Sequence, residues 1–441
     1  MGESWSSSKW TQTSNALLVE QKKELRDIAS NIVAGGRGIL ALDEFTGIFG
    51  KRMATIGKEN TENIRRVYRQ TLFEEAERVK AYIGGVILFD ETLYQTDSET
   101  GGRIVKLLQD NHITLGIKVD QGTVSQGGCP GEVVTGGLEG LDERCERYKK
   151  ARCDFAKWRG VLKITADGTP GDVNIRAVTS DLAKDARVCQ HNGLVPIVEP
   201  EILHDRDYFI EVCQRVAGRV LSAQYRELIE HDVYIEGTLL KPNMVTPGQS
   251  CATRASHQEI ALRTVTAFIR VVPHVMPGVV FLSGGMSEQD ASLNLNAMNG
   301  LQNVKKPWKL SFSFGRALQA SSIKAWGGKE ENRAAYGDAF FQRAKANGEA
   351  CHGMYKGSGR PALTRSLGPI MSIENNQQLC LLIFSKICVV FDIIPAALSD
   401  SLQNVTSQLK THHNNFGPSH GCGCYFLHFP IFNDYDRYSR R

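Results

Sequence analysis

Short apolar runs recur along the chain from Leu17 onward, and most of them are separated by stretches in which apolar residues return at helical spacing. Short apolar runs bounded by turn residues are typical of buried strands, whereas apolar positions three or four residues apart are typical of amphipathic helices. The pattern predicts eight strands, at residues 38–42, 83–89, 112–119, 155–164, 194–198, 234–240, 278–282 and 308–314.

Helical spacing fills most of the intervals between these runs. The helices expected from it lie at residues 20–34, 60–80, 144–153, 177–192, 207–229 and 256–271, with further helical pieces after residue 316. Alternating strands and helices indicate a parallel sheet with crossover helices. Eight such units in one domain favour an α/β fold of the closed (β/α)8 TIM-barrel type over an open, doubly wound sheet.

Charged and polar residues stand where the predicted strands end, and any one of them could be an ordinary solvated side chain. Their recurrence at the same place in successive units is harder to explain in that way. Reactive groups of (β/α)8 barrels lie at the carboxyl ends of the strands, so we expect these side chains to share one site. They are Asp43, Lys118, Lys157, Arg159, Glu199, Glu201, Lys241, Ser283 and Arg316.

The stretch YIEGTLLKPNMVTPG, residues 234–248, carries the most informative of these residues. An apolar segment runs directly into Lys241, and Pro242 then stops the strand. A lysine in this position either extends its amine to solvent or is held at the barrel rim for chemistry. Spacing alone leaves both interpretations open.

The residue types suggest a chemistry for the second interpretation. A lysine among cations and apolar walls loses affinity for its proton, and its neutral amine can attack a carbonyl to form a Schiff base. Carboxylates such as Glu199 and Asp43 can then move protons. Backbone N–H groups at Gly284 and Gly285 beside Ser283 suit a phosphate oxygen. The remaining cations suit anionic groups at either end of a substrate, with Arg316 at this phosphate and Lys118 and Arg159 at a second one.

Composition narrows the class of protein. With 41% hydrophobic and 23% charged residues among 441, the chain is a globular protein with ample material for a core. A net charge of +4 makes no case for binding nucleic acid or a membrane. The eleven cysteines are scattered without repeated CxxC pairs, which predicts reduced thiols and a cytoplasmic location. Barrel histidines lie singly, so no metal and no other cofactor is expected.

Several long motifs, in order, resemble class I fructose-bisphosphate aldolase. The resemblance runs from about residue 17 to about residue 359, and it implies a Schiff-base mechanism without a metal, a role in glycolysis and gluconeogenesis, and a homotetramer acting on phosphorylated sugars. The motifs are GILALDE (38–44), GIKVD (116–120), FAKWRGVLKI (155–164), VPIVEPEIL (195–203), EGTLLKPNMVTPG (236–248), FLSGG (281–285) and LSFSFGRALQASSIKAWGG (310–328).

The resemblance also implies roles for individual residues. Lys241 matches the Schiff-base lysine and Glu199 the main acid/base carboxylate, while Asp43 and Lys157 match residues that assist cleavage and Glu201 an accessory carboxylate. The residues matching the site for the dihydroxyacetone-phosphate end are Ser283, Gly284, Gly285, Ser313, Gly315 and Arg316. Those matching the cationic site for the other phosphate are Lys118, Arg159, Arg52 and Arg65.

The chain departs from the family pattern in three places. Gln121 stands where animal-type relatives often have lysine, which removes a nearby charge. Phe45 and Ile48 stand where small hydroxyl residues are common, which removes two potential hydrogen bonds to the far phosphate. After residue 359 the family's tail with its terminal tyrosine is replaced by an atypical sequence, expected to be a poorly ordered extension. The expected divisions are therefore an N-terminal extension at 1–16, a barrel at 17–359 and a tail at 360–441. The tail's apolar piece at 379–394 is too short and too charged to predict a membrane span.

Two other functions stay open at this level. A Schiff-base barrel of the transaldolase type needs one phosphate site instead of two. A barrel that has lost catalysis and persists as a scaffold or binding protein would form no covalent adduct with its ligand.

Overall fold

A computed structural model describes residues 16–164 and 170–357 of the chain. Eight parallel strands close into a barrel in the order β1-β10-β9-β8-β7-β6-β3-β2, which confirms the predicted (β/α)8 fold. The barrel strands are β1 (Gly38–Leu42), β2 (Ile83–Leu88), β3 (Thr114–Lys118), β6 (Phe155–Lys163), β7 (Val195–Leu203), β8 (Leu239–Leu240), β9 (Gly278–Phe281) and β10 (Lys309–Phe314).

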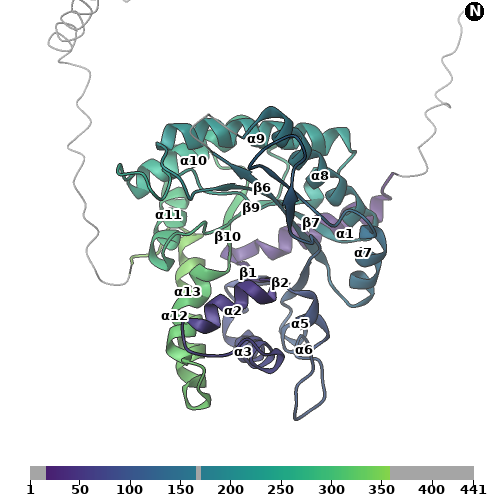
Figure 1. The fold of residues 1–441 in the computed structure, drawn as a ribbon, viewed down its shortest axis with the longest axis vertical. Coiled ribbons are helices and arrows are strands. Elements are labelled where there is room, and N and C mark those ends of the chain that lie inside the picture. The colour runs from purple at the N-terminus through teal and green to yellow at the C-terminus, as the bar shows by residue number, and fades with distance from the viewer. Residues whose placement is uncertain (1–15, 165–169, 358–441) are drawn as a thin grey trace, which may run out of the picture. The chain divides into compact units, whose positions relative to one another are not determined.

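Helices surround this barrel, as Figure 1 shows for α8, α9 and α10 outside strands β6, β7 and β9. The α-helices are α1 (Val19–Ile32), α2 (Thr46–Ala54), α3 (Glu62–Glu74), α4 (Ala76–Val79), α5 (Asp90–Tyr94), α6 (Lys106–Asp110), α7 (Leu141–Lys150), α8 (Asp172–His191), α9 (Ile210–Glu230), α10 (His257–Val271), α11 (Glu288–Gly300), α12 (Arg316–Trp326) and α13 (Arg333–Ala350). Three short 3-10 helices, η1 (Ala34–Gly36), η2 (Ile235–Gly237) and η3 (Glu330–Asn332), and a hairpin of β4 (Thr123–Ser125) and β5 (Val133–Thr135) complete the described elements.

Two apolar layers follow from the alternation of side chains along each strand. On β1, Ile39 and Ala41 belong to a cluster inside the barrel, whereas Leu40 and Leu42 belong to the larger cluster between strands and helices. Helix α1 contributes Leu25 to the inner cluster. The amphipathic α1 therefore covers one end of the barrel and leaves the other end free for a site.

Three elements differ from the sequence prediction. The strand expected at 234–240 is a 3-10 turn followed by the two residues of β8, because Thr238 caps the turn by donating its hydroxyl to the carbonyl of Ile235 at 2.8 Å. The helix expected at 60–80 divides at Glu75 into α3 and α4. Strand β7 continues to Leu203 because it pairs with β6 over nine residues, so Glu199 lies within the strand instead of following it.

Predictions about the ends of the chain fall on residues outside 16–164 and 170–357. They are the extension at 1–16 (apart from residue 16), the poorly ordered tail at 360–441 and the apolar piece at 379–394. Within the described residues, none of the helices has the length and apolar character needed to cross a membrane.

Asp185 on α8 is a buried carboxylate that the fold tolerates at a cost. It is fully buried, it accepts a hydrogen bond only from the Cys189 thiol at 3.3 Å, and its second oxygen has no partner among the described residues. Burial raises the pKa of Asp185 to about 8. The folded protein therefore holds this proton more tightly than the unfolded chain does. Between about pH 4 and about pH 8 the carboxyl group is ionised in the unfolded chain but protonated in the folded protein, so the free energy of unfolding falls as the pH rises through this range.

We therefore expect Asp185→Asn to stabilise the protein in a pH-dependent way. The amide cannot ionise, so the melting temperature of the variant relative to the parent should rise by a few degrees between about pH 5 and about pH 8.5, as measured by thermal unfolding. Asp172→Asn, at an exposed site on the same helix, is the matched control and should show no such trend. An equal effect of Asp185→Asn at both pH values would contradict the prediction.

Candidate active site

A cavity of about 720 Å³ opens at the carboxyl ends of the barrel strands. Its position is the one expected for the site of a (β/α)8 barrel. It brings together almost all of the residues that the sequence singled out, from seven of the eight barrel strands and the segments that follow them. These are Asp43, Arg52, Lys118, Lys157, Arg159, Glu199, Glu201, Lys241, Ser283, Gly284, Gly285, Ser313, Gly315 and Arg316.

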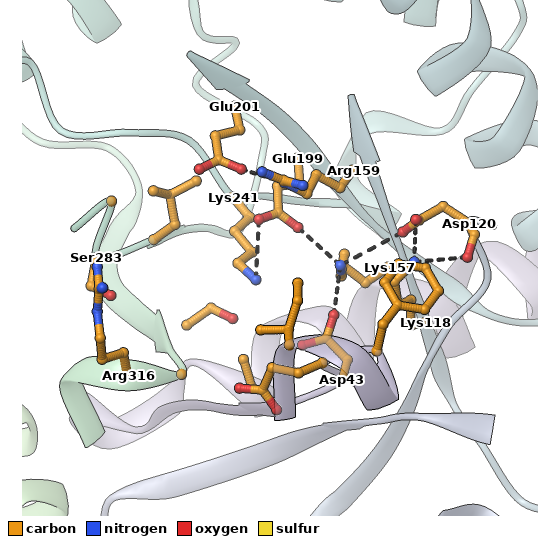
Figure 2. Close-up of a pocket in the computed structure, with 18 of the residues that line it drawn as sticks. Asp43, Lys118, Asp120, Lys157, Arg159, Glu199, Glu201, Lys241, Ser283 and Arg316 are labelled. Atoms are coloured by element: carbon orange, nitrogen blue, oxygen red, sulfur yellow. Dashed lines mark hydrogen bonds and ion pairs between the residues drawn. The ribbon is translucent and has the colours of Figure 1, made fainter. Parts of the chain in front are cut away.

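Lys241 occupies the middle of this cavity, between Ser283 and Arg316 on one side and Lys118 on the other (Figure 2). Its backbone N–H donates to the carbonyl of Val198 at 2.8 Å, and this bond fixes the residue immediately after β8. The side chain is only 5% exposed, so it does not extend to solvent. Its Nζ lies 3.3 Å from a carboxylate oxygen of Glu199.

Lys157 on β6 is the centre of an ion-pair network next to Lys241. Its Nζ lies 2.6 Å from Asp43, 3.3 Å from Glu199 and 3.7 Å from Asp120. Burial alone would lower the pKa of Lys157, but the attraction of Asp43, Glu199 and Asp120 outweighs it and raises the pKa above its ordinary value. Lys157 therefore remains an ammonium group that orients the carboxylates around it.

Asp43, which directly follows β1, is held in its ionised form. Burial alone would raise its pKa, but the ammonium groups of Lys157, Lys241 and Lys118 outweigh that effect and hold the pKa below its ordinary value. A buried carboxylate that stays ionised can accept a hydrogen bond or a proton from a bound hydroxyl group.

One end of the cavity offers hydrogen-bond donors without partners. The turn at Gly284 and Gly285 has positive φ angles of 45° and 87°, and among the described residues neither backbone N–H donates to an acceptor. The buried hydroxyl of Ser313 also has no partner there. The guanidinium of Arg316, at the start of α12, is exposed and makes no ion pair within residues 16–164 and 170–357. Backbone and side-chain donors in this arrangement suit a phosphate group.

Gly285 is needed for this arrangement, because its φ of 87° lies in a region where residues with a Cβ are strained, and a Cβ here would also lie 1.9 Å from the side-chain Nε2 of Gln249. We expect Gly285→Ala to raise the KM for a phosphorylated substrate by about tenfold, since the turn would have to shift its donors and lose part of a charged hydrogen bond. Steady-state kinetics checks this. Gly218→Ala on α9, where a Cβ meets open space, should leave KM within about twofold. Equal KM values for Gly285→Ala and the parent would contradict the prediction.

The cations expected at the other end of the cavity are already paired with carboxylates. Lys118 donates to the backbone carbonyl of Asp120 at 2.7 Å and also contacts its carboxylate. Arg159 pairs with Glu201. Arg52 lies 2.6 Å from Glu44.

Arg65 is not among the residues that line the cavity, although the family resemblance implies a place for it in the second phosphate site. Its guanidinium pairs with Glu91 at 2.6 Å and donates to Asn60. Glu91 lies on α5, directly after β2, and Arg65 pairs with it instead of lining the cavity.

Asp120 is a site residue that the analysis of the sequence missed. It lines the cavity between Lys118 and Lys157 and is 7% exposed. A signal was present, because Asp120 follows Lys118 by two residues just beyond β3 and therefore continues on the same face of the chain. Glu44, the partner of Arg52, was missed as well. In the part of the chain that the structure describes, no cluster of three or more His, Cys, Asp or Glu residues could hold a metal ion.

Comparison with known proteins gives a consistent result. The family model "Glycolytic: Fructose-bisphosphate aldolase class-I" matches residues 24–367. Fructose-bisphosphate aldolase C of Rattus norvegicus is 56% identical over 344 residues, which cover 78% of this chain and 94% of that protein. The protein of the same name from Carassius auratus is 55% identical over 361 residues, 82% of this chain and 98% of its own length.

A solved structure shows the same similarity in three dimensions. Fructose-bisphosphate aldolase from Plasmodium falciparum, solved in complex with TRAP and a small-molecule inhibitor, matches with a TM-score of 0.76 and 48% sequence identity. The match covers 78% of this chain and 98% of that one.

Proposed function

The chain belongs to the class I fructose-bisphosphate aldolase family, a family of lyases, and we propose that it cleaves fructose 1,6-bisphosphate reversibly through a Schiff base on Lys241. The products are dihydroxyacetone phosphate and glyceraldehyde 3-phosphate. The observation that carries this proposal is the position of the Lys241 amine, which is buried, 3.3 Å from Glu199 and between two groups of anion-binding residues.

Schiff-base formation begins when the ammonium group of Lys241 passes a proton to Glu199, 3.3 Å away. The neutral amine then attacks the ketone carbon of the sugar and gives a carbinolamine. The carboxyl of Glu199 is placed to donate the proton with which the carbinolamine hydroxyl leaves as water, because it lies beside the same amine. Lys157 contacts the other carboxylate oxygen of Glu199 and thereby limits the directions in which this carboxylate can turn.

The iminium that forms is an electron sink for the adjacent carbon. The bond between the third and fourth carbons of the sugar can break once the hydroxyl of the fourth carbon gives up its proton. Asp43, kept ionised by the ammonium groups around it, is suited to receive this proton with the help of Lys157. The aldehyde leaves, and the enamine that remains on Lys241 is protonated and hydrolysed to release the ketose phosphate.

The remaining residues of the cavity position the substrate. We assign the phosphate of the dihydroxyacetone-phosphate half to Ser283, Gly284, Gly285, Ser313, Gly315 and Arg316, whose donors converge at one end. We assign Glu201 an accessory role through Arg159, with which it forms an ion pair. We assign Lys118, Arg159 and Arg52, which also line the cavity, to the other half of the sugar.

We also propose that the protein acts in the cytoplasm as a homotetramer, as the family resemblance implies. Analytical ultracentrifugation of the purified chain tests the assembly, and a species of four chains is expected.

A product assay tests the proposed reaction. The protein incubated with fructose 1,6-bisphosphate alone should release equal amounts of dihydroxyacetone phosphate and glyceraldehyde 3-phosphate, and a chelator should not change the rate. A transaldolase would need an added acceptor aldehyde, and a scaffold would release nothing. Either of these outcomes would overturn the proposal.

A further inference from the structure

We propose that Phe45 and Ile48 make the far end of the cavity apolar, so that a second phosphate adds little to recognition and a ketose 1-phosphate whose other end carries no charge is used about as well as the bisphosphate. This inference rests on the proposed function, because it concerns the substrate of the same site. The far end is the part of the cavity lined by Phe45, Ile48 and Lys118.

The aromatic ring of Phe45 covers the ammonium group that would be expected to bind a far phosphate. The Nζ of Lys118 lies 4.1 Å from the centre of this ring, which is the geometry of a cation–π contact. The ring also packs edge-on against Phe89 at 5.9 Å, and this contact holds it in place. A phosphate approaching Lys118 must therefore displace the ring or lie against its apolar surface.

The same ammonium group has little hydrogen-bonding capacity left. Lys118 has three N–H groups, and it already contacts both the backbone carbonyl and the carboxylate of Asp120. Arg159 is also neutralised, by Glu201. Arg52 pairs with Glu44 and donates to Gln319 on α12, so its guanidinium is directed toward Gly315 instead of this end. A phosphate dianion would meet these carboxylates at close range, and their repulsion offsets part of the attraction of the cations.

Ile48 extends the apolar surface toward the mouth of the cavity. It lies on α2, one turn after Phe45, and 49% of it is exposed although it is a large apolar residue. Lys51 also lines the cavity from α2, but it is exposed at the rim, where a solvated charge contributes little to binding. The far end therefore presents a ring and a branched aliphatic side chain where a charged group would need donors.

The opposite end of the cavity has the reverse character. The N–H groups of Gly284 and Gly285, the hydroxyl of Ser313 and the guanidinium of Arg316 have no partners within the described ranges. One phosphate is thus provided with free donors, whereas a second would lose water without gaining equivalent bonds. A hydroxyl or apolar group at the far end carries no such cost.

Kinetics with two substrates test the inference. We expect the kcat/KM of the parent protein for fructose 1,6-bisphosphate to lie within about tenfold of its kcat/KM for fructose 1-phosphate, because each good hydrogen bond to a charged group would be worth about tenfold or more. A preference for the bisphosphate of more than about tenfold overturns the inference.

Variants of Phe45 test whether its apolar ring is the reason that a second phosphate adds little to kcat/KM. Phe45→Ser supplies a hydroxyl and uncovers Lys118, so the ratio of kcat/KM for bisphosphate over monophosphate should rise by about tenfold. Phe45→Leu keeps an apolar surface and is the matched control, with a ratio within about twofold of the parent. A ratio that is unchanged in Phe45→Ser, or equally raised in Phe45→Leu, contradicts the role of Phe45.

A binding measurement keeps this test independent of turnover. Calorimetry should give hexitol 1-phosphate and hexitol 1,6-bisphosphate similar dissociation constants on the parent protein, and only Phe45→Ser should favour the bisphosphate. Failure of the proposed function would look different, because dihydroxyacetone phosphate would then form no reducible adduct with Lys241. An adduct together with a strong preference for the bisphosphate would overturn this inference alone.

Discussion

Replacing Lys241 by methionine is expected to lower the rate of cleavage at least about 10⁴-fold while the protein stays folded. Methionine has nearly the length and volume of the lysine stem but no amine, so no Schiff base can form. The side chain is 5% exposed, and among residues 16–164 and 170–357 it makes one ion pair, with Glu199. Glu199 keeps a second cation, Lys157 at 3.3 Å, and its charge is therefore not left buried alone.

The measurement for Lys241→Met is steady-state cleavage of fructose 1,6-bisphosphate together with thermal unfolding. The matched control is Lys149→Met, because Lys149 also pairs with carboxylates, Glu24 and Asp154, but lies outside the cavity. The control should retain cleavage within about twofold. Residual cleavage by Lys241→Met at more than about a hundredth of the parent rate would contradict the assignment of the nucleophile.

Glu199→Gln is expected to lower kcat by about 10²–10⁴-fold, with a smaller change in KM. The amide keeps the size of the carboxylate but cannot donate and accept protons at the carbinolamine. It also removes a negative charge that lies 3.3 Å from both Lys241 and Lys157. The loss should therefore appear in single-turnover formation of the Schiff base, measured by stopping the reaction with borohydride at short times.

The control for Glu199→Gln is Glu91→Gln. Glu91 is half-buried and pairs with Arg65 at 2.6 Å and Arg69 at 3.2 Å, but it does not line the cavity. We expect this variant to lose stability and to keep kcat within about twofold. If the two variants reduced kcat equally, the effect at Glu199 would reflect a disturbed fold and not proton transfer.

The closed barrel could be predicted from the sequence because most of the barrel strands begin as short apolar runs separated by helical patterns. Strand β1 is fully buried and stops at Asp43, and β9 is fully buried and opens into the turn at Gly284. These boundaries depend on local residues alone. The same local signal located most of the site, because the carboxyl ends of parallel strands meet at one end of a barrel.

Features that depend on contacts between distant segments could not be predicted. Helix α2 was missed because Gly47 and Gly50 interrupt its helical pattern, and it forms against the barrel with Phe49 and Met53 buried. The length of β7 depends on its pairing with β6 and not on its own residues. The family resemblance implied a place for Arg65 in the site, and its pairing with Glu91 on another element could not be read from the sequence.

The apolar character of the far end could be predicted in part from the sequence. Phe45 and Ile48 were visible as departures in the sequence, and both line the cavity. The position of the ring over Lys118 could not be inferred, because it depends on the packing of Phe45 against Phe89. The sequence thus predicted the loss of two hydroxyl groups, and the structure shows in addition that an apolar surface covers the ammonium group of Lys118.

The most direct test of the account is to reduce the protein with borohydride in the presence of dihydroxyacetone phosphate and to map the modified peptide by mass spectrometry. The account predicts a stable adduct of one triose phosphate on Lys241 and none on Lys157 or Lys118. No adduct, or an adduct confined to another lysine, would contradict the claim that the amine of Lys241 captures the ketose carbon.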